Sequence, residues 1–387
     1  MKISRRQLLF LGGVVGGGII TGAAQRVLSS SSNVSSISNV PQVKSESIPS
    51  SNAIAKVPIA PKGLFAPVRG DVRILVISDL NSAYGSTDYE PQVTQSIQMI
   101  PDWQPDLILC GGDMVAGQYP SLTKAEIEAM WAGFDRYIAK PIRQTKIPYG
   151  FTIGNHDASG ALSVTGKFLF GNERDLASAY WNNPQNDPGL KFVDRAGFPF
   201  YYTFEQNNIF YLVWDASTGQ IPKTQLVWVE KALASTAAQT AKMRIAIGHL
   251  PLYAVAVGRN EAGEILADNE KLRSLLEKYK VHTYISGHDH AYYPARKGKL
   301  ELLHAGALGS GPRPWLNSKL RPINPLTIID INLNSQTTDY TTYNMQTLEV
   351  VDHQTLPRMI TSVAGTVLRR DLKAEDLTSE ERSLLNL

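Results

Sequence analysis

The chain has 387 residues, a formal net charge of +3 at pH 7 and 43% hydrophobic residues. This composition is typical of a globular protein with one or two domains. The small charge excess, without a basic stripe interleaved with aromatic residues, argues against a nucleic-acid partner. The single cysteine, Cys110, excludes an intrachain disulfide and a zinc site of the C-x-x-C type.

Residues 1–28 have the pattern of an export signal. Arg5 and Arg6 precede an apolar run that begins at Leu8, and the small residues at 22–24 suit a cleavage site. The stretch SRRQLLF resembles the twin-arginine signal, and the glycine-rich apolar run is milder than that of a firm membrane anchor. We therefore expect export by the twin-arginine machinery to the periplasm or the extracellular space, with transient membrane association through the leader. An ordinary secretory signal, or an uncleaved leader that tethers the protein to a membrane, is the alternative.

Three further segments follow the signal. Residues 29–68 are rich in Ser, Asn and Val and are expected to form a disordered linker. Residues 69–348 carry the strand and helix patterns of the folded domain, and residues 349–387 are expected to form a tail that is partly helical. Within this tail, Thr378 and Glu381 have the spacing of a helix capping box.

Apolar strands alternate with helical patterns through the folded domain. We predict strands at 72–78, 106–110, 148–153, 243–247 and 281–286, a hairpin over 201–215 that turns at Asn207-Asn208, and helices at 91–100, 121–139, 223–236 and 268–280. This alternation indicates βαβ units and a parallel sheet. The region 159–200 is polar and rich in Gly, Asn and Pro, and it is expected to be an insertion or lid.

Polar side chains stand directly after five of the predicted strands, usually behind a glycine. They are Asp79 and Asn81, Asp113, Asn155-His156-Asp157, His249, and His288-Asp289-His290. Because open α/β sheets bind ligands at the carboxyl ends of their strands, we expect these side chains to meet at one edge. A single one of them is more often a structural histidine or a turn residue. Five in succession, all of types that hold metal ions, indicate a metal site.

The order of these motifs resembles that of the calcineurin-like metallophosphoesterases, in particular bacterial exported members. That family has Asp-x-His, Gly-Asp, Gly-Asn-His-Asp/Glu, a lone strand-end His and Gly-His-x-His, and the resemblance extends from about Val72 to His304. The fold that it implies is an α/β four-layer sandwich, in which two mixed β-sheets are flanked by helices.

Carried over residue by residue, the resemblance implies a centre of two divalent or trivalent metal ions, with manganese, iron or zinc as candidates. The implied metal ligands are Asp79, Asn81, Asp113, Asn155, His249, His288 and His290. Asp113 would bridge the two ions. His156 is the implied catalytic histidine, and Asp157 beside it is a second catalytic candidate. Substrate contacts are expected from Asn81 and from three tyrosines near the strand ends, with local packing as the alternative for the tyrosines: Tyr84, Tyr253 and Tyr292.

Asn81 departs from the family pattern, which has histidine at this position. An amide oxygen is a weaker and harder ligand than imidazole. Asn81 can ligate directly or through water, can hydrogen-bond the substrate or nucleophile instead, or can mark the loss of the first metal. The other ligand positions survive, which favours ligation and an oxygen-richer site suited to manganese or iron. Purple acid phosphatases, which resemble this family, place a tyrosine where this chain has Ala116, so no tyrosinate–iron centre is predicted.

The function implied is that of an exported, metal-dependent phosphoesterase. It would hydrolyse phosphomonoesters or phosphodiesters of a phosphorylated small molecule by attack of water activated at the dinuclear centre. The alternatives are a non-catalytic protein that binds a phosphorylated ligand on the same fold, and a protein phosphatase. The presence of His156 together with the complete second ligand set favours the enzyme.

Overall fold

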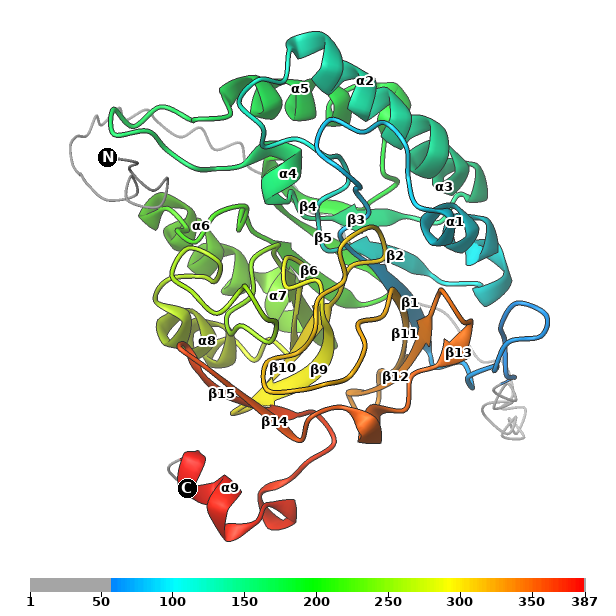
Figure 1. Cartoon of the computed structure of the whole chain (residues 1–387), viewed down its shortest axis with the longest axis vertical. Helices are drawn as coiled ribbons and strands as arrows, with labels where there is room; N and C mark the ends of the chain where they lie inside the picture. Colours follow the sequence, from blue (N-terminus) through cyan, green and yellow to red (C-terminus); the bar gives the residue numbers. More distant parts are fainter. Residues whose placement is uncertain (1–56, 386–387) are drawn as a thin grey trace, which may run out of the picture. The chain divides into compact units, whose positions relative to one another are not determined.

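The structure, a computed structural model, describes residues 57–385. Within this part of the chain, two mixed β-sheets are flanked by helices, which confirms the predicted fold class (Figure 1). The predicted export signal and the linker up to residue 56 lie outside the described residues and stay predictions. Among the helices of residues 57–385, none has the length and apolar character needed to cross a bilayer.

The smaller sheet has six strands and the larger has nine. The smaller sheet runs in the order β13 (Glu349–Val350), β12 (Thr337–Asn344), β11 (Pro325–Asn332), β1 (Val72–Ile77), β2 (Leu107–Cys110) and β3 (Tyr149–Phe151). The larger runs β14 (Met359–Ser362), β15 (Gly365–Arg369), β9 (Tyr292–Lys297), β10 (Leu300–Ala305), β8 (Thr283–Ser286), β7 (Met243–Ile247), β6 (Ile209–Val213), β5 (Tyr201–Gln206) and β4 (Phe192–Gly197).

The helices lie outside these sheets. They are α1 (Pro91–Trp103), α2 (Lys124–Phe134), a π-helical turn (Asp135–Ala139), α3 (Lys140–Thr145), α4 (Asn155–Ala158), α5 (Gly171–Trp181), α6 (Lys223–Leu233), α7 (Thr236–Thr240), α8 (Asn269–Lys278) and α9 (Ser379–Leu384). Figure 1 shows α1, α2 and α3 on the side of the smaller sheet and α6, α7 and α8 on the side of the larger. Short 3-10 turns occur at Pro184–Asn186, His353–Thr355 and Ala374–Asp376.

The central strands of both sheets are parallel, and this places their carboxyl ends at one edge. β1, β2 and β3 pair in parallel, as do β6, β7, β8 and β10. Their sequences are nearly continuous apolar runs, such as VRILVI and LILC, because both faces of these strands are covered. The carboxyl ends of five of these strands carry the polar residues that were singled out from the sequence.

Local signals in the sequence correspond to real element boundaries. The capping box predicted at Thr123 and Glu126 is formed at the start of α2, and that at Thr378 and Glu381 starts α9. The predicted hairpin over 201–215 is β5–β6, and its two turn residues both have positive φ. Asparagine tolerates this left-handed conformation better than most residues. The helix predicted at 121–139 is divided, because its last five residues form the π-helical turn.

The region 159–200 is not a simple insertion or lid. Its middle forms α5, and its end forms β4, which pairs with β5 at the edge of the larger sheet. Trp181 of α5 is 2% exposed and stacks on Phe151 of β3 with ring centroids 3.9 Å apart. The polar residues that suggested a lid are the exposed face of α5 and its flanking turns, so most of this region is part of the domain.

The folded unit also extends past both boundaries predicted from the sequence. Strands β14 and β15 belong to the expected tail, but β15 pairs with β9 and completes the larger sheet. At the other end, residues 57–68 of the expected linker are packed, because the guanidinium group of Arg73 donates to the carbonyls of Ile59 (2.8 Å) and Pro67 (3.0 Å). The sequence pattern assigned neither segment to the folded domain, and the contacts that hold them form only on folding.

Arg73 is the buried cation of the smaller sheet. Its Nε and Nη2 donate to the two carboxylate oxygens of Asp330 on the neighbouring strand β11, at 2.9 and 2.8 Å. The side chains are 0% and 4% exposed, so neither charge is solvated by water. The pair, with the carbonyls of residues 59 and 67, joins β1 to β11 and to the incoming chain.

We expect Arg73→Ala to destabilise the protein by about 3–5 kcal/mol, because Asp330 is left as a buried, uncompensated charge. Urea denaturation followed by tryptophan fluorescence measures this loss. The matched control is Lys271→Ala, which removes an exposed ion pair with Asp268 and should cost about 0.5 kcal/mol or less. A loss below about 1 kcal/mol for Arg73→Ala would contradict the buried-pair account.

Candidate metal centre

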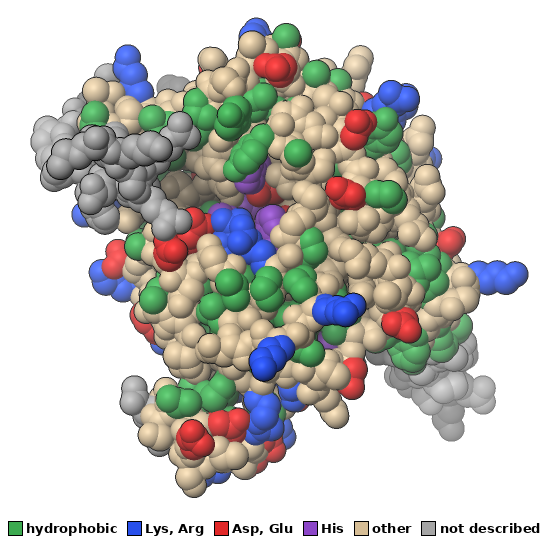
Figure 2. Space-filling view, viewed as in Figure 1, with side chains coloured by type: hydrophobic (Ala, Val, Ile, Leu, Met, Phe, Trp, Pro, Cys, Tyr) green, Lys and Arg blue, Asp and Glu red, His purple; other side chains and the backbone are tan. Residues whose placement is uncertain are grey.

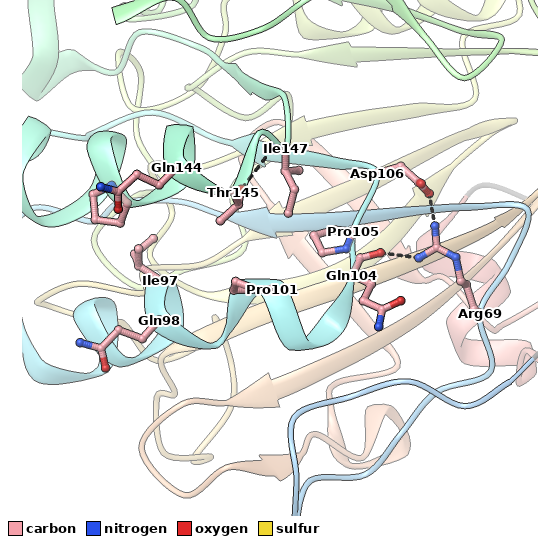
Figure 3. Close-up of a pocket in the computed structure, with 11 residues that line it drawn as sticks. Arg69, Ile97, Gln98, Pro101, Gln104, Pro105, Asp106, Gln144, Thr145 and Ile147 are labelled. Atoms are coloured by element: carbon pink, nitrogen blue, oxygen red, sulfur yellow. Dashed lines mark hydrogen bonds and ion pairs between the residues drawn. The ribbon is translucent and has the colours of Figure 1, made fainter.

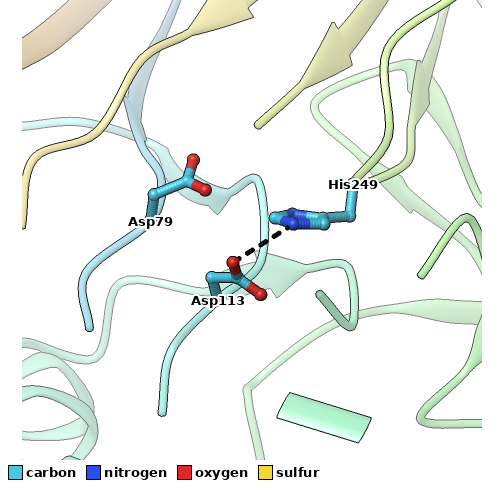
Figure 4. Close-up of side chains that lie close together, drawn as sticks. All are labelled: Asp79, Asp113 and His249. Atoms are coloured by element: carbon cyan, nitrogen blue, oxygen red, sulfur yellow. Dashed lines mark ion pairs between the residues drawn. The ribbon is translucent and has the colours of Figure 1, made fainter. Parts of the chain in front are cut away.

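Three residues from distant parts of the chain meet at the shared sheet edge. Asp79 follows β1, Asp113 follows β2 and His249 follows β7, and one ligand atom of each lies within 4.8 Å of the others (Figure 4). Asp113 Oδ2 lies 3.3 Å from His249 Nε2. All three residues are buried. The convergence expected from the sequence is therefore present for this triad.

Asn155 and His288 join the triad on the side of His249. The amide oxygen of Asn155 lies 2.9 Å from His249 Nε2 and 3.0 Å from His288 Nδ1. The opposite ring nitrogens are engaged, because His249 Nδ1 contacts the Gly111 carbonyl at 2.8 Å and His288 Nε2 contacts Glu264 Oε2 at 3.0 Å. Since a carbonyl and a carboxylate only accept, these contacts place a proton on the outer nitrogens. The inner nitrogen of His288 then turns its lone pair toward Asn155, and the inner nitrogen of His249 is the position at which a proton or a metal ion binds.

His290 stands on the side of Asp79. Its Nδ1 donates to the Gly311 carbonyl at 2.8 Å, and its Nε2 lies 3.3 Å from Asp79 Oδ1. His290 Nε2 and Asp113 Oδ2 are both buried and have no hydrogen-bond partner. Buried polar atoms normally have a hydrogen-bond partner, so two such atoms without one in the same cluster need an explanation.

These observations fit a pair of cations. Lone pairs of oxygen and nitrogen that face one another repel unless a proton or a metal ion lies between them. The first set of ligand atoms comes from Asp79, Asp113 and His290, and the second from Asp113, Asn155, His249 and His288. Asp113 belongs to both sets, as the implied bridging role requires.

The charges of the cluster also suit metal binding. Burial alone would raise the pKa of Asp79 and of Asp113, but the neighbouring histidines outweigh it, and both pKa values lie below their usual range. Burial lowers the pKa of His288 to about 3, so this imidazole is neutral. Burial would also lower the pKa of His249, but Asp113 and Asp79 raise it to about 9.

The loops that carry these ligands are tightly constrained. Asp79, Asp113, His288 and His290 all have positive φ, between 49° and 66°. Non-glycine residues rarely adopt this conformation, and it persists where the surrounding structure enforces it. The preceding glycines are needed for close approach, since a Cβ on Gly154 would lie 2.1 Å from Asp113 Oδ1. This is the physical reason why glycines recur before the predicted ligands.

Asn81 lies beside this cluster. It is 6% exposed, and its backbone N–H donates to the Asp113 carbonyl at 3.2 Å. Its amide nitrogen donates to the Val115 carbonyl at 3.3 Å. Its roles as a ligand and as a substrate contact stay predictions.

His156 lies beside Asp113, and its role as the catalytic histidine stays a prediction. Its backbone N–H donates to Asp113 Oδ1 at 2.9 Å, and its Nδ1 donates to the Gly117 carbonyl at 3.0 Å. The Nε2 atom therefore faces the cluster, 4.0 Å from Asp113 Oδ2. The side chain is 15% exposed, so a substrate can reach it.

Asp157 has a structural role in place of the catalytic role that was predicted. Its carboxylate accepts the backbone N–H groups of Asp113, Met114, Val115 and Gly154, at 2.7 to 2.9 Å. It is 1% exposed, so both oxygens are occupied within the protein. Asp157 holds the loop after β2 against the loop after β3 and thereby positions Asp113.

Two of the three predicted substrate tyrosines face away from the site. Tyr253 is buried and its hydroxyl donates to Glu270 at 2.7 Å, while the hydroxyl of Tyr292, also buried, contacts His353 at 2.9 Å. For these two the alternative of local packing is correct. Tyr84 is 60% exposed, and its ring centroid lies 5.2 Å from that of His156. Its position agrees with a substrate contact, which stays a prediction.

Gln118 and Glu264 are functional candidates that sequence reasoning missed. Gln118 Oε1 accepts from the amide nitrogen of Asn155 at 2.6 Å and so turns the Asn155 oxygen toward the histidines. Glu264 orients His288 from the outer side. Glu264 stands in a loop segment without a motif, so only the fold brings it to His288. Gln118 stands in the same loop as Asp113, and this nearness to the Gly-Asp motif is the signal that could have found it.

The surface over this cluster is hollowed. Figure 2 shows histidine side chains at the floor of a depression bordered by basic, acidic and apolar side chains. A separate groove of about 820 Å³ lies at the amino ends of β2 and β3, on the opposite edge of the smaller sheet (Figure 3). There Arg69 is paired with Asp106 at 2.6 Å. Since the groove lies away from the ligands, it is not part of this site.

Comparisons with known proteins agree with this geometry. The family model described as calcineurin-like phosphoesterase matches residues 72–292. A purple acid phosphatase, PPD1, from yellow lupin (Lupinus luteus) seeds superposes with a TM-score of 0.51 at 18% identity, over 73% of this chain and 52% of that chain. GAP50, the anchor in the inner membrane complex of Plasmodium, gives a TM-score of 0.47 at 14% identity, over 81% of this chain and 94% of that chain.

This chain thus spans about half of the length of the lupin phosphatase. At these identities the likeness to solved structures concerns the fold alone. A search of curated proteins found no significant match.

We expect metal affinity to rise with pH, by about tenfold per unit up to about pH 9, because a cation must displace the proton of His249. Calorimetric titration with manganese at pH 6.5, 7.5 and 8.5 measures this slope. The same titration in two buffers of different ionisation enthalpy should report release of about one proton. An affinity that does not change with pH would contradict the raised pKa of His249.

Gln118→Ala should weaken metal binding by about 10- to 100-fold, because Asn155 loses the partner that orients its amide. Gln118→Glu keeps an acceptor for the Asn155 amide and should retain most of the affinity. Gln185→Ala, at an exposed position outside the site, is the control. Equal affinities for Gln118→Ala and wild type, measured by the same titration, would remove Gln118 from the site.

Proposed function

The chain belongs to the calcineurin-like phosphoesterase family, and from this premise we propose that it is an exported phosphomonoesterase or phosphodiesterase with a dinuclear metal centre. Membership makes it a hydrolase that acts on phosphate esters. The family model covers the loops after β1, β2, β3, β7 and β8, so it includes all seven predicted ligands. Export rests on the twin-arginine pattern of residues 1–28.

The observation that carries the proposal is the buried set of facing lone pairs around Asp113. Two cations held by the two ligand sets would polarise the phosphoryl group and activate water near neutral pH. The shared position of Asp113 supports two ions rather than one, because its Oδ2 is buried and unpaired between the two sets. The carboxylate oxygens of Asp79 and Asp113 in the first set favour manganese or iron over zinc, and the amide oxygen of Asn81 would add to this preference as a ligand.

The chain's own residues supply positioning and proton transfer. His156 Nδ1 is held by the Gly117 carbonyl, so Nε2 is the atom free to act. When Nε2 carries a proton it can hydrogen-bond a phosphoryl oxygen or protonate the leaving alkoxide. Asp157 and Gln118 keep Asp113 and Asn155 in place through backbone and amide hydrogen bonds. A site held in this way loses little energy to reorganisation during the reaction.

Hydrolysis of p-nitrophenyl phosphate and bis(p-nitrophenyl) phosphate tests the proposal. We expect turnover of one or both esters with added manganese, its loss after chelation, and its return when manganese is restored. Iron and zinc should be tried in parallel because the metal pair is not assigned. Absence of turnover with all three metals, in protein shown to be folded by circular dichroism, would contradict the catalytic function.

His156→Ala should lower kcat by about 10²- to 10⁴-fold while metal content stays near that of the wild type. The reason is that the variant removes the proton donor but none of the proposed ligands. Steady-state kinetics and elemental analysis of the same sample measure both quantities. His353→Gln, a change at a histidine that contacts Tyr292, is the control. Loss of metal in His156→Ala would make His156 a ligand instead.

A further inference from the structure

Two arginines that are not proposed ligands stand beside the metal centre. Arg259 lies between β7 and α8, and Arg313 lies between β10 and β11. The two loops are joined, because the Val257 N–H donates to the Pro314 carbonyl at 2.9 Å. Arg313 lies outside the part of the chain that the family model matches.

Both arginines are one contact away from the ligands His288 and His290. The backbone N–H of Arg313 donates to the His290 carbonyl at 3.0 Å. Glu264 Oε2 accepts from Arg259 Nη1 at 2.6 Å and from His288 Nε2 at 3.0 Å. In agreement, Figure 2 shows basic side chains directly beside the histidines of the hollow.

Only one of the two arginines has a carboxylate partner. Arg259 Nη1 pairs with Glu264 Oε2 at 2.6 Å. Across residues 57–385, no carboxylate lies within ion-pair distance of the Arg313 guanidinium group, which donates to the Val257 carbonyl at 3.3 Å. The charges of Arg259, Glu264 and Asp289 reach Arg313 at longer range, and Asp289 accepts from the Val255 N–H and from His304 through its Oδ2.

Both side chains also keep unused hydrogen-bond donors. The Nε atoms of Arg259 and Arg313 are buried and have no partner among the described residues. Arg313 is held against the loop backbone, since a Cβ on Gly258 would lie 2.8 Å from its Nη1. Two fixed guanidinium groups with free donors match the flat, two-oxygen face of a phosphate or a carboxylate.

We propose that Arg259 and Arg313 form an anion subsite next to the metal centre, which binds a second phosphate or a carboxylate of the substrate. The inference rests on the proposed function, because the metal centre would hold the phosphate that is hydrolysed. Such a subsite would favour, as substrates, phosphate esters that carry a second anionic group. Such a group would neutralise the arginine pair and fill its free donors.

Two pairs of substrates test the subsite and distinguish its two possible anions. Glycerol 3-phosphate and 3-phosphoglycerate differ by a carboxylate, and fructose 6-phosphate and fructose 1,6-bisphosphate differ by a phosphate. We expect kcat/KM to favour the doubly anionic member of at least one pair by about tenfold or more. Arg313→Gln should bring that ratio close to one, and Arg259→Gln should lower it as well. Arg321→Gln, at an exposed arginine of the same β10–β11 connection, should leave it unchanged.

Calorimetry with the same four compounds on manganese-loaded protein measures the preference without turnover. If nothing is hydrolysed but the preference exists in binding and is lost in Arg313→Gln, the catalytic proposal fails and the subsite stands. The subsite is overturned if wild type shows no preference in either pair. It is also overturned if the arginine variants weaken both members of a pair equally or leave the ratio unchanged.

Discussion

The mutual repulsion of buried lone pairs around Asp113 is the constraint on which the rest of this structure depends. Oxygens of Asp79, Asp113 and Asn155 and nitrogens of His249 and His288 face one another at a sheet edge that water does not solvate. Such an arrangement is stable only with positive charge inside it, as protons or as metal ions. A protein that keeps this cluster buried is therefore built around a cationic centre.

The conformational free energy needed to hold the ligands in place is shared among the strand-end loops that carry them. Left-handed backbone at four ligand positions is unfavourable for each residue alone. It is compensated by hydrogen bonds that tie one strand-end loop to another, of which the four donated to Asp157 are the clearest. The sheets themselves are apolar and regular, and the left-handed residues lie in the connections, both at the ligand edge and at turns away from it such as Asn207-Asn208.

Charge is arranged in two zones around the depression. The ligand cluster combines ionised Asp79 and Asp113 with histidines whose pKa values are shifted in opposite directions. Next to it, Arg259 shares Glu264 with His288, and Arg313 has no carboxylate at ion-pair distance among the described residues. The first zone suits cations and the second suits anions. Their closeness is what a site for a charged phosphate ester requires, because the ester must be attracted while the metal ligands stay negative.

The sequence by itself determined the fold class and the ends of the central strands, and it predicted a ligand set of which Asp79, Asp113 and His249 lie together in the structure. Apolar runs followed by glycine and a polar residue mark where a buried strand ends. Only the tertiary structure decided which polar residues face the cluster. Asp157 accepts backbone N–H groups, Tyr253 and Tyr292 are buried elsewhere, and Gln118 and Glu264, which belong to none of the motifs, contact Asn155 and His288.

The domain boundaries, too, were decided by the tertiary structure and not by local sequence pattern. Residues 57–68 are predicted as linker and β14–β15 as tail, yet Arg73 holds the carbonyls of Ile59 and Pro67, and β15 pairs with β9. The direction of a side chain and the partner of a segment depend on residues that folding brings close, and local composition does not reveal which residues these are.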